Sequence, residues 1–174
     1  MNARLAQRVQ RIKPSATVAI TALASRLRDE GRDIIALSVG EPDFPTPAHI
    51  RQAACAAIER GETKYTVVDG SRSLKLAVRE KFRRDNGLEF EPDEILISSG
   101  AKQACFNACE ALLEAGDEVV IPAPCWVSYP DMVRFADATP IIVETEPARG
   151  FKITPAQLDA ALNDSTRVLI INSP

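Results

Sequence analysis

One segment of the chain has the residue types and spacing of an anion-binding turn. Residues 95–113 read ILISSGAKQACFNACEALL, so the small residues Ser98, Ser99, Gly100 and Ala101 lie between an apolar run and a helical pattern. The first amides of a helix have no partner inside the helix and attract negative charge, and Lys102 adds a positive charge in the first turn. A phosphate group is the ligand that this pattern favours.

An ordinary structural turn is the alternative interpretation, because strand–turn–helix connections with small residues are common in α/β proteins. The segment also lacks the glycine patterns of dinucleotide-binding folds and of P-loops. Neither of those two nucleotide-binding classes is therefore predicted.

A second segment combines prolines with the chain's single tryptophan. Residues 122–129 read PAPCWVSY and follow a predicted strand. Open parallel sheets bind ligands at the carboxyl ends of their strands, and the ring of Trp126 held there would stack on a planar ligand. A tryptophan in the core or in an interface is the alternative.

Two loops carry weaker signals. Residues 40–44 read GEPDF, a stiff turn in which the amide of Gly40 could meet a carboxylate, and Lys64-Tyr65-Thr66 is followed by Asp69-Gly70. Loop rigidity and turn chemistry also account for both patterns.

Cysteine and histidine give no indication of a metal site or of a disulfide framework. The four cysteines are scattered, the chain has one histidine, His49, and no pair of cysteines has CxxC spacing. We expect buried, reduced thiols at Cys55, Cys105, Cys109 and Cys125, and His49 at the surface.

These segments must be positioned by alternating strands and helices. Apolar periodicity predicts helices over residues 17–30, 47–60, 71–85, 101–114, 127–136 and 155–162. Short apolar runs predict strands over 94–98, 118–121, 140–144 and 167–171, and a strand or extended segment over 34–39. Because the strands are continuous apolar runs separated by helices, the sequence predicts an α/β fold, with a mainly parallel sheet covered on both faces.

Composition narrows the class of protein further. The 174 residues include 21 Lys and Arg against 24 Asp and Glu, a net charge of −3, which gives no reason to expect a nucleic-acid partner. No apolar run approaches the roughly 20 residues of a membrane span, and the first residues lack a secretory pattern. We therefore expect a cytoplasmic location.

The sequence ends directly after an apolar strand of a kind usually buried, so we expect the natural chain to continue beyond Pro174.

Taken together, the motifs resemble one family. The order KPSAT, GEPDF, KYT, SSGAKQA, PAPCWVSYP and a final NSP is similar to class I aminotransferases, in the bacterial branch of aspartate and prephenate aminotransferases. The resemblance covers residues 9–174 and the first part of such an enzyme. It implies the type I fold of transferases that depend on pyridoxal 5′-phosphate (PLP). Residues 1–46 would form the arm, the first helix and part of the small domain, and residues 47–174 the first, incomplete part of the large PLP-binding α/β domain.

The resemblance also implies which residues bind the cofactor. Gly100, Ala101 and Lys102 are expected at the PLP phosphate, and Trp126 is expected to stack on the pyridine ring. Such enzymes are homodimers with shared active sites, and Tyr65 is expected to reach the phosphate of the neighbouring subunit.

Substrate contacts follow from the same resemblance. Gly40 is expected at the α-carboxylate, with Trp126 also bordering the substrate. Lys13, Ser15 and Thr17 are expected to face the distal carboxylate of a dicarboxylic substrate.

The implied reaction is PLP-dependent transamination, in amino acid metabolism and biosynthesis, between aspartate or a related dicarboxylic amino acid and a 2-oxo acid. No catalytic residue is expected within the 174 residues, because the lysine that forms the Schiff base in the family lies beyond Pro174. The 174-residue chain alone is therefore expected to be inactive. An aminotransferase-like ligand-sensing regulator, or another PLP reaction such as elimination or decarboxylation, are the alternatives.

Overall fold

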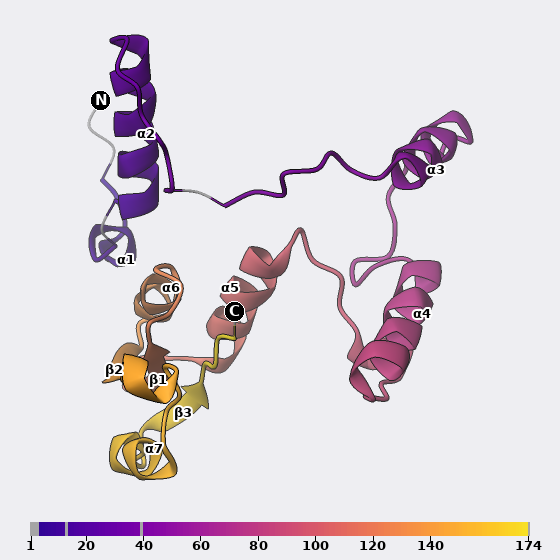
Figure 1. The fold of residues 1–174 in the computed structure, drawn as a ribbon. Helices are drawn as coiled ribbons and strands as arrows, with labels where there is room; N and C mark the ends of the chain where they lie inside the picture. Colours follow the sequence, from indigo (N-terminus) through magenta and orange to yellow (C-terminus); the bar gives the residue numbers. More distant parts are fainter. Residues whose placement is uncertain (1–3, 13, 39, 174) are drawn as a thin grey trace. The chain divides into compact units, whose positions relative to one another are not determined.

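The computed structural model describes residues 4–12, 14–38 and 40–173 of the chain (Figure 1). The contacts between residues divide it into two units. The first, here called the sheet unit, consists of Met1–Val39 and Ala104–Pro174, and the second, the helical unit, consists of Gly40–Gln103. The predicted domain boundary between residues 46 and 47 stays a prediction.

Three parallel strands form the centre of the sheet unit. They are β1 (Glu118–Ala123), β2 (Thr139–Glu144) and β3 (Thr166–Leu169), in the order β2-β1-β3. Strand β1 pairs with β2 along its whole length, while its pairing with β3 is shorter and irregular near Val119. The three strands predicted for this part of the chain are confirmed, and β1 extends two residues further than predicted.

Two crossover helices connect these strands. They are α6 (Tyr129–Phe135) between β1 and β2, and α7 (Pro155–Ala161) between β2 and β3. Parallel strands require such crossovers, which are almost always right-handed. Because the chain first moves from β1 outward to β2 and then returns past β1 to β3, the two helices lie on opposite faces of the sheet (Figure 1). The predicted α/β architecture with helices on both faces is confirmed.

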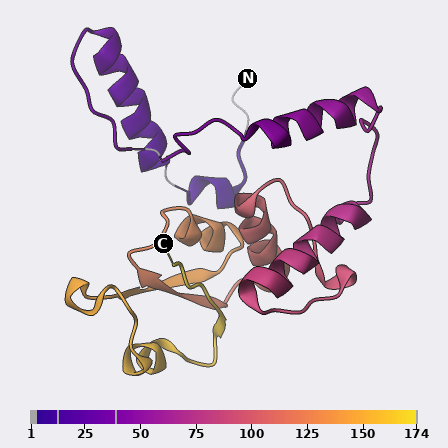
Figure 2. The ribbon, with the colours of Figure 1, turned by 45° about the vertical axis from the view of Figure 1, so that its right-hand side comes forward.

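The core of the sheet unit lies on the face of β1 that carries Val119 and Ile121. Both side chains are fully buried, together with Val133 of α6 and with Cys109 of α5 (Ala101–Leu112). Val120 is also fully buried but lies outside this cluster, because successive side chains of a strand point to opposite faces. Burial of β1 on both faces explains its continuous apolar sequence. Helices α6 and α7 lie on either side of the sheet in the ribbon (Figure 2).

The N-terminal part of the sheet unit contains two helices. Helix α1 (Gln7–Gln10) lies against α6, where Arg11 pairs with Asp137 at 2.5 Å. Helix α2 (Ala16–Asp29) begins at Ser15, whose side chain accepts a hydrogen bond from the amide of Val18. The helix predicted over 17–30 is confirmed. Residues 34–38 form no strand, so of the two alternatives predicted for this segment only the extended one remains.

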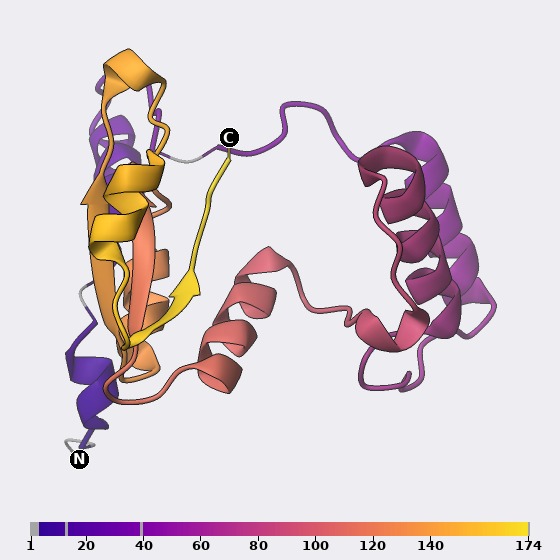
Figure 3. The ribbon, with the colours of Figure 1, turned by 90° about the horizontal axis from the view of Figure 1, so that it is seen from below.

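The helical unit contains α3 (Ala48–Glu59) and α4 (Arg72–Lys81), joined by the loop that carries Tyr65 (Figure 3). A π-helical turn (Phe82–Asn86) continues α4, and a 3-10 turn (Pro92–Glu94) follows. The helix predicted over 71–85 is therefore confirmed, with a π-helical end.

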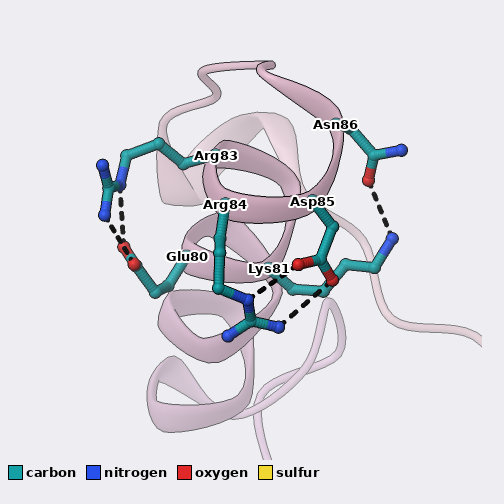
Figure 4. A network of polar contacts seen from close by, with 6 residues as sticks. All are labelled: Glu80, Lys81, Arg83, Arg84, Asp85 and Asn86. Atoms are coloured by element: carbon teal, nitrogen blue, oxygen red, sulfur yellow. Dashed lines mark hydrogen bonds and ion pairs between the residues drawn. The ribbon is translucent and has the colours of Figure 1, made fainter.

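A network of two exposed ion pairs and one side-chain hydrogen bond surrounds the end of α4 (Figure 4). It consists of the contacts Glu80–Arg83, Arg84–Asp85 and Lys81–Asn86. The hydrogen bond from Arg83 holds the pKa of Glu80 below its usual value. Exposed pairs of this kind contribute little to stability. Gly87, which follows at a φ of +64°, ends the helix as its sequence predicts.

Two sequence predictions are wrong in the described part of the chain. Residues 94–98 form no strand there, because a strand needs a neighbour to pair with and the amide of Ile97 instead donates to the carbonyl of Asp69 at 3.0 Å. Cys55 is exposed rather than buried, since no side chain of α3 is buried.

The remaining predictions for cysteine and histidine agree with the structure or differ only in degree. Cys109 is buried, Cys105 and Cys125 are half-buried, and all four thiols are free. His49 is exposed, as expected. Among the described helices, none has the length and apolar character needed to cross a membrane.

Candidate active site

The turn before α5 leads into a helix that begins at Ala101, as its sequence predicts, although residues 94–98 before it form no strand. Gly100 has a φ of +86°, a conformation that favours glycine, and a Cβ built there would meet no atom within 4 Å. The amide of Gly100 donates to the carbonyl of Ser98 at 2.8 Å, and the amide of Ser99 donates to Oε1 of Gln103 at 2.5 Å. These two amides are therefore engaged within the turn, and α5 begins with the amide of Ala101.

The first turn of α5 is suited to hold a phosphate. A helix of 12 residues has its positive dipole end here, and its first amides have no intrahelical acceptor. Lys102 lies in this first turn and adds its charge. The open space beside Gly100 leaves the backbone accessible to a bound group. The turn thus fits the phosphate of the implied cofactor, chiefly through the backbone after Gly100.

Trp126 lies in the sheet unit, just beyond the carboxyl end of β1. Its ring contacts Tyr129 edge to face, with the ring centroids 5.2 Å apart and the planes at 88°. Tyr129 in turn donates a hydrogen bond to Oδ1 of Asn172 at 3.1 Å, beyond the end of β3. The hydroxyl of Thr145, which follows β2, donates to the carbonyl of Ala123. Hydrogen bonds and a ring contact made by side chains therefore connect the carboxyl ends of all three strands.

A cavity of about 760 Å³ opens at these strand ends. Its lining includes Cys125, Lys152 and Asn172. Burial raises the pKa of the Cys125 thiol, with a further contribution from Glu144, so this cysteine is protonated at neutral pH and is a poor nucleophile. The cavity offers a site for binding, which is where open α/β sheets hold their ligands.

Tyr129, Lys152 and Asn172 are residues of this region that the sequence interpretation missed. Tyr129 carries a signal, since it belongs to the same segment as Trp126, directly after a predicted strand, where ligand contacts are expected. Asn172 directly follows an apolar strand, the position in which ligand contacts are expected. Lys152 gives no comparable signal.

The other predicted residues are divided between the two units. Tyr65 is fully exposed and Gly40 has no neighbour where its Cβ would be, both within the helical unit. In the sheet unit, Ser15 caps α2, and the carbonyl of Thr17 accepts a hydrogen bond from Thr21 at 2.8 Å. Lys13 lies outside the described residues. The structure brings Gly100, Ala101 and Lys102 together as one turn, and the roles of the predicted residues stay predictions.

In the described part of the chain, no group of three or more His, Cys, Asp and Glu side chains is arranged to hold a metal ion.

Comparison with curated proteins finds close relatives. The aspartate/prephenate aminotransferase of Nitrosomonas europaea is 55% identical over 171 residues, which are 98% of this chain and 43% of the relative. The probable aspartate/prephenate aminotransferase of Thermus aquaticus is 50% identical over 170 residues, which are 98% of this chain and 44% of the relative. The chain thus spans less than half the length of these relatives and matches one portion of them.

Solved structures have the same fold. The aspartate aminotransferase of Rhizobium meliloti matches with a TM-score of 0.95 and 47% identity, over 99% of this chain and 43% of that one. The aspartate aminotransferase of Thermus thermophilus with maleate gives a TM-score of 0.95 and 48% identity, over 99% of this chain and 45% of that one. The fold is therefore that of aspartate aminotransferases.

The family model described as "Aminotransferase class I and II" matches residues 32–174, which include the turn at Gly100 and the strand ends around Trp126. With that match and relatives near 50% identity over nearly its whole length, the chain belongs to the class I and II aminotransferases.

Proposed function

We propose that this protein is a PLP-dependent transaminase, which transfers the amino group of aspartate or a related dicarboxylic amino acid to a 2-oxo acid. The observation that carries the proposal is the turn at Gly100, with its left-handed glycine and open space at the start of α5, in a chain of this family. A cofactor phosphate is the ligand that such a turn favours.

In this proposal, two regions of the chain hold the cofactor. The backbone at Ala101 and Lys102, after the turn at Gly100, binds the phosphate, and Trp126 stacks on the pyridine ring. The contact of Trp126 with Tyr129 supports this role, because it fixes the orientation of the indole ring. PLP supplies an electron sink for carbanion chemistry, while the protein supplies binding and orientation.

The substrate side of the proposal rests on the N-terminal segment. Gly40 would bind the α-carboxylate, and Lys13, Ser15 and Thr17 would face the distal carboxylate. The side chain of Ser15 already caps α2, so it would bind a substrate carboxylate in addition to that role. The Thermus thermophilus structure is described with maleate, a dicarboxylate, which supports a dicarboxylic substrate for this chain.

We also propose a homodimer with shared active sites. The loop before α4 supports this, because Tyr65, Val67 and Val68 are largely or fully exposed, and a loop that exposes three large side chains is suited to contact a second copy. In the dimer, Tyr65 would reach the phosphate bound by the neighbouring subunit. Sedimentation of the purified protein tests the oligomeric state, and a monomer at micromolar concentration with full activity would contradict this part.

A cytoplasmic location completes the proposal. Its support is the set of four free thiols, which suits a reducing compartment. Fractionation of cells that express the native gene tests it.

The decisive experiment is a PLP titration of the purified product of the native gene, followed by addition of amino acids. We expect visible absorption from bound PLP, which changes with aspartate far more than with alanine. Formation of oxaloacetate from aspartate should then depend on an added 2-oxo acid, with 2-oxoglutarate and prephenate compared as acceptors. A protein that never binds PLP would refute the proposal. Binding without any response to aspartate would leave a ligand-sensing role in its place.

A further inference from the structure

Lys75 is a buried charge in the helical unit, away from the turn at Gly100. Among the described residues, Lys75 is the one charged residue that is buried, with 8% of its side chain exposed. Its Nζ donates a hydrogen bond to Oδ2 of Asp69, whose side chain is 44% exposed. The ammonium group of Lys75, on α4, is therefore shielded from water and binds a carboxylate of the preceding loop.

Asp69 is attached in two directions at once. Its carboxylate binds α4 through Lys75, while its carbonyl accepts the amide of Ile97 at 3.0 Å. The next amide, of Gly70, donates to the carbonyl of Val67 at 3.1 Å and closes the turn that follows Tyr65. Asp69 therefore joins the Tyr65 loop, α4 and the segment that leads into the turn at Gly100.

The loop packs closely against Ile97, with no room for an added atom between them. Gly70 has a φ of +109°, and a Cβ built on it would lie 2.4 Å from Cγ1 of Ile97. The backbone of the loop thus lies directly on the Ile97 side chain, three residues before Gly100. A displacement of the loop must be transmitted to that segment, because packed groups at this separation move together.

Stability alone is a poor explanation for the ion pair. An ion pair with a buried ammonium group is often no more stabilising than apolar residues of similar size, although removal of Asp69 is costly because it leaves the Lys75 charge buried and unpaired. The hydrogen bond from Lys75 also holds the pKa of Asp69 below its usual value, so the Asp69 carboxylate is ionised at neutral pH. What such a pair provides is a fixed position for the loop that carries Asp69.

We propose that Asp69 and Lys75 are positioning residues that hold the Tyr65 loop and the turn at Gly100 in a fixed relation. The inference rests on the proposed function, in which the turn binds the phosphate of its own subunit and Tyr65 reaches that of the neighbour. The ion pair then couples the phosphate contacts of two active sites through a single chain. Its loss weakens PLP binding even where the fold is intact.

The test uses the product of the native gene in four forms: wild type, Asp69→Asn, the double variant Asp69→Asn with Lys75→Met, and the control Glu80→Gln. Asp69→Asn alone leaves the Lys75 charge buried and is expected to be less stable. The double variant removes both charges and is expected to regain stability. Glu80→Gln breaks an exposed ion pair at the other end of α4 and is expected to change nothing (Figure 4).

Hydrogen exchange without PLP is the first measurement, on peptides that cover residues 64–70 and 95–101. We expect faster exchange in both peptides for the double variant and not for Glu80→Gln. The dissociation constant of PLP is the second measurement, for which we expect the double variant to be weakened about fivefold or more, at an unchanged midpoint of thermal unfolding.

Unchanged exchange in the double variant would overturn the proposed coupling. Faster exchange with a PLP dissociation constant within twofold of wild type would also overturn it, because the pair would then be merely structural. If wild-type protein binds no PLP, the proposed function fails on its own. The exchange measurement still tests the coupling in that case.

Discussion

Replacement of Gly70 by alanine is a sharp test of the packing described above. The substitution adds one methyl group to a residue with a φ of +109°, directly against Ile97. A left-handed conformation costs an alanine about 1–2 kcal/mol. The added carbon would lie 2.4 Å from Cγ1 of Ile97, roughly 1 Å inside the favourable carbon–carbon separation of about 3.5 Å.

The overlap requires the backbone or the Ile97 side chain to move. Overpacking of this size costs about 1–3 kcal/mol, so the free energy of unfolding should fall by about 2–5 kcal/mol in Gly70→Ala. Gly116→Ala is the matched control, because Gly116 has a φ of +104° and a Cβ there meets no atom within 4 Å. Only the conformational part, about 1–2 kcal/mol, is expected for the control.

Urea unfolding followed by circular dichroism measures both variants, in the product of the native gene. Combination of Gly70→Ala with Ile97→Ala removes the nearest clashing atom and should recover part of the difference, a coupling that a double-mutant cycle detects. Equal destabilisation by Gly70→Ala and Gly116→Ala would refute the reasoning, because the contact with Ile97 would then carry no energy.

Three further predictions concern other parts of the molecule. Because Lys75 lowers the pKa of Asp69, the stability that Asp69 contributes is fully present above the ordinary pKa of 3.8 and is lost as the pH falls through the lower folded value. In urea unfolding, the difference in free energy of unfolding between wild type and Asp69→Asn should therefore be constant near neutral pH and should shrink below pH 3.8. A constant difference down to about pH 2 would contradict this prediction. Thr154→Ala removes the side-chain oxygen that accepts the amide of Gln157 at the start of α7 and should destabilise the protein by about 1 kcal/mol in the same assay, whereas Thr154→Ser should cost much less. Trp126→Ala should weaken PLP binding about 2- to 13-fold, as measured by titration, because stacking of an aromatic ring contributes about 0.5–1.5 kcal/mol; an unchanged dissociation constant would remove Trp126 from the cofactor site.

The sequence was sufficient to predict what depends on local patterns. Strand β1 is a continuous apolar run because it is buried on both faces, and the helix predicted over 17–30 starts within one residue of the observed α2. The turn at Gly100 was predictable for the same reason, since its left-handed glycine and the start of α5 are set by neighbouring residues.

Contacts between distant segments were not predictable in this way. Residues 94–98 have the composition of a strand, but a strand also needs a neighbouring strand to pair with. In the structure the amide of Ile97 instead donates a hydrogen bond to the carbonyl of Asp69. The contact of Tyr129 with Asn172 spans 43 residues and depends on the register of the sheet. Lys75 looks like an ordinary surface lysine of α4 until the loop before the helix brings Asp69 to it.

The position of β1 between its two neighbours has a consequence for synthesis on the ribosome. The pairing of β1 with β2 and the packing of α5 and α6 on β1 use residues that precede β3. These residues include the fully buried Val119, Val120, Ile121 and Val133 and the buried Cys109 and Leu113. A nascent chain can therefore form this βαβ unit before β3 has been made. At about 5–20 residues per second, the 22 residues from Glu144 to Thr166 take about one to four seconds. During that interval the second edge of the central strand is open, and it is the surface that a chaperone or a second nascent chain would meet first.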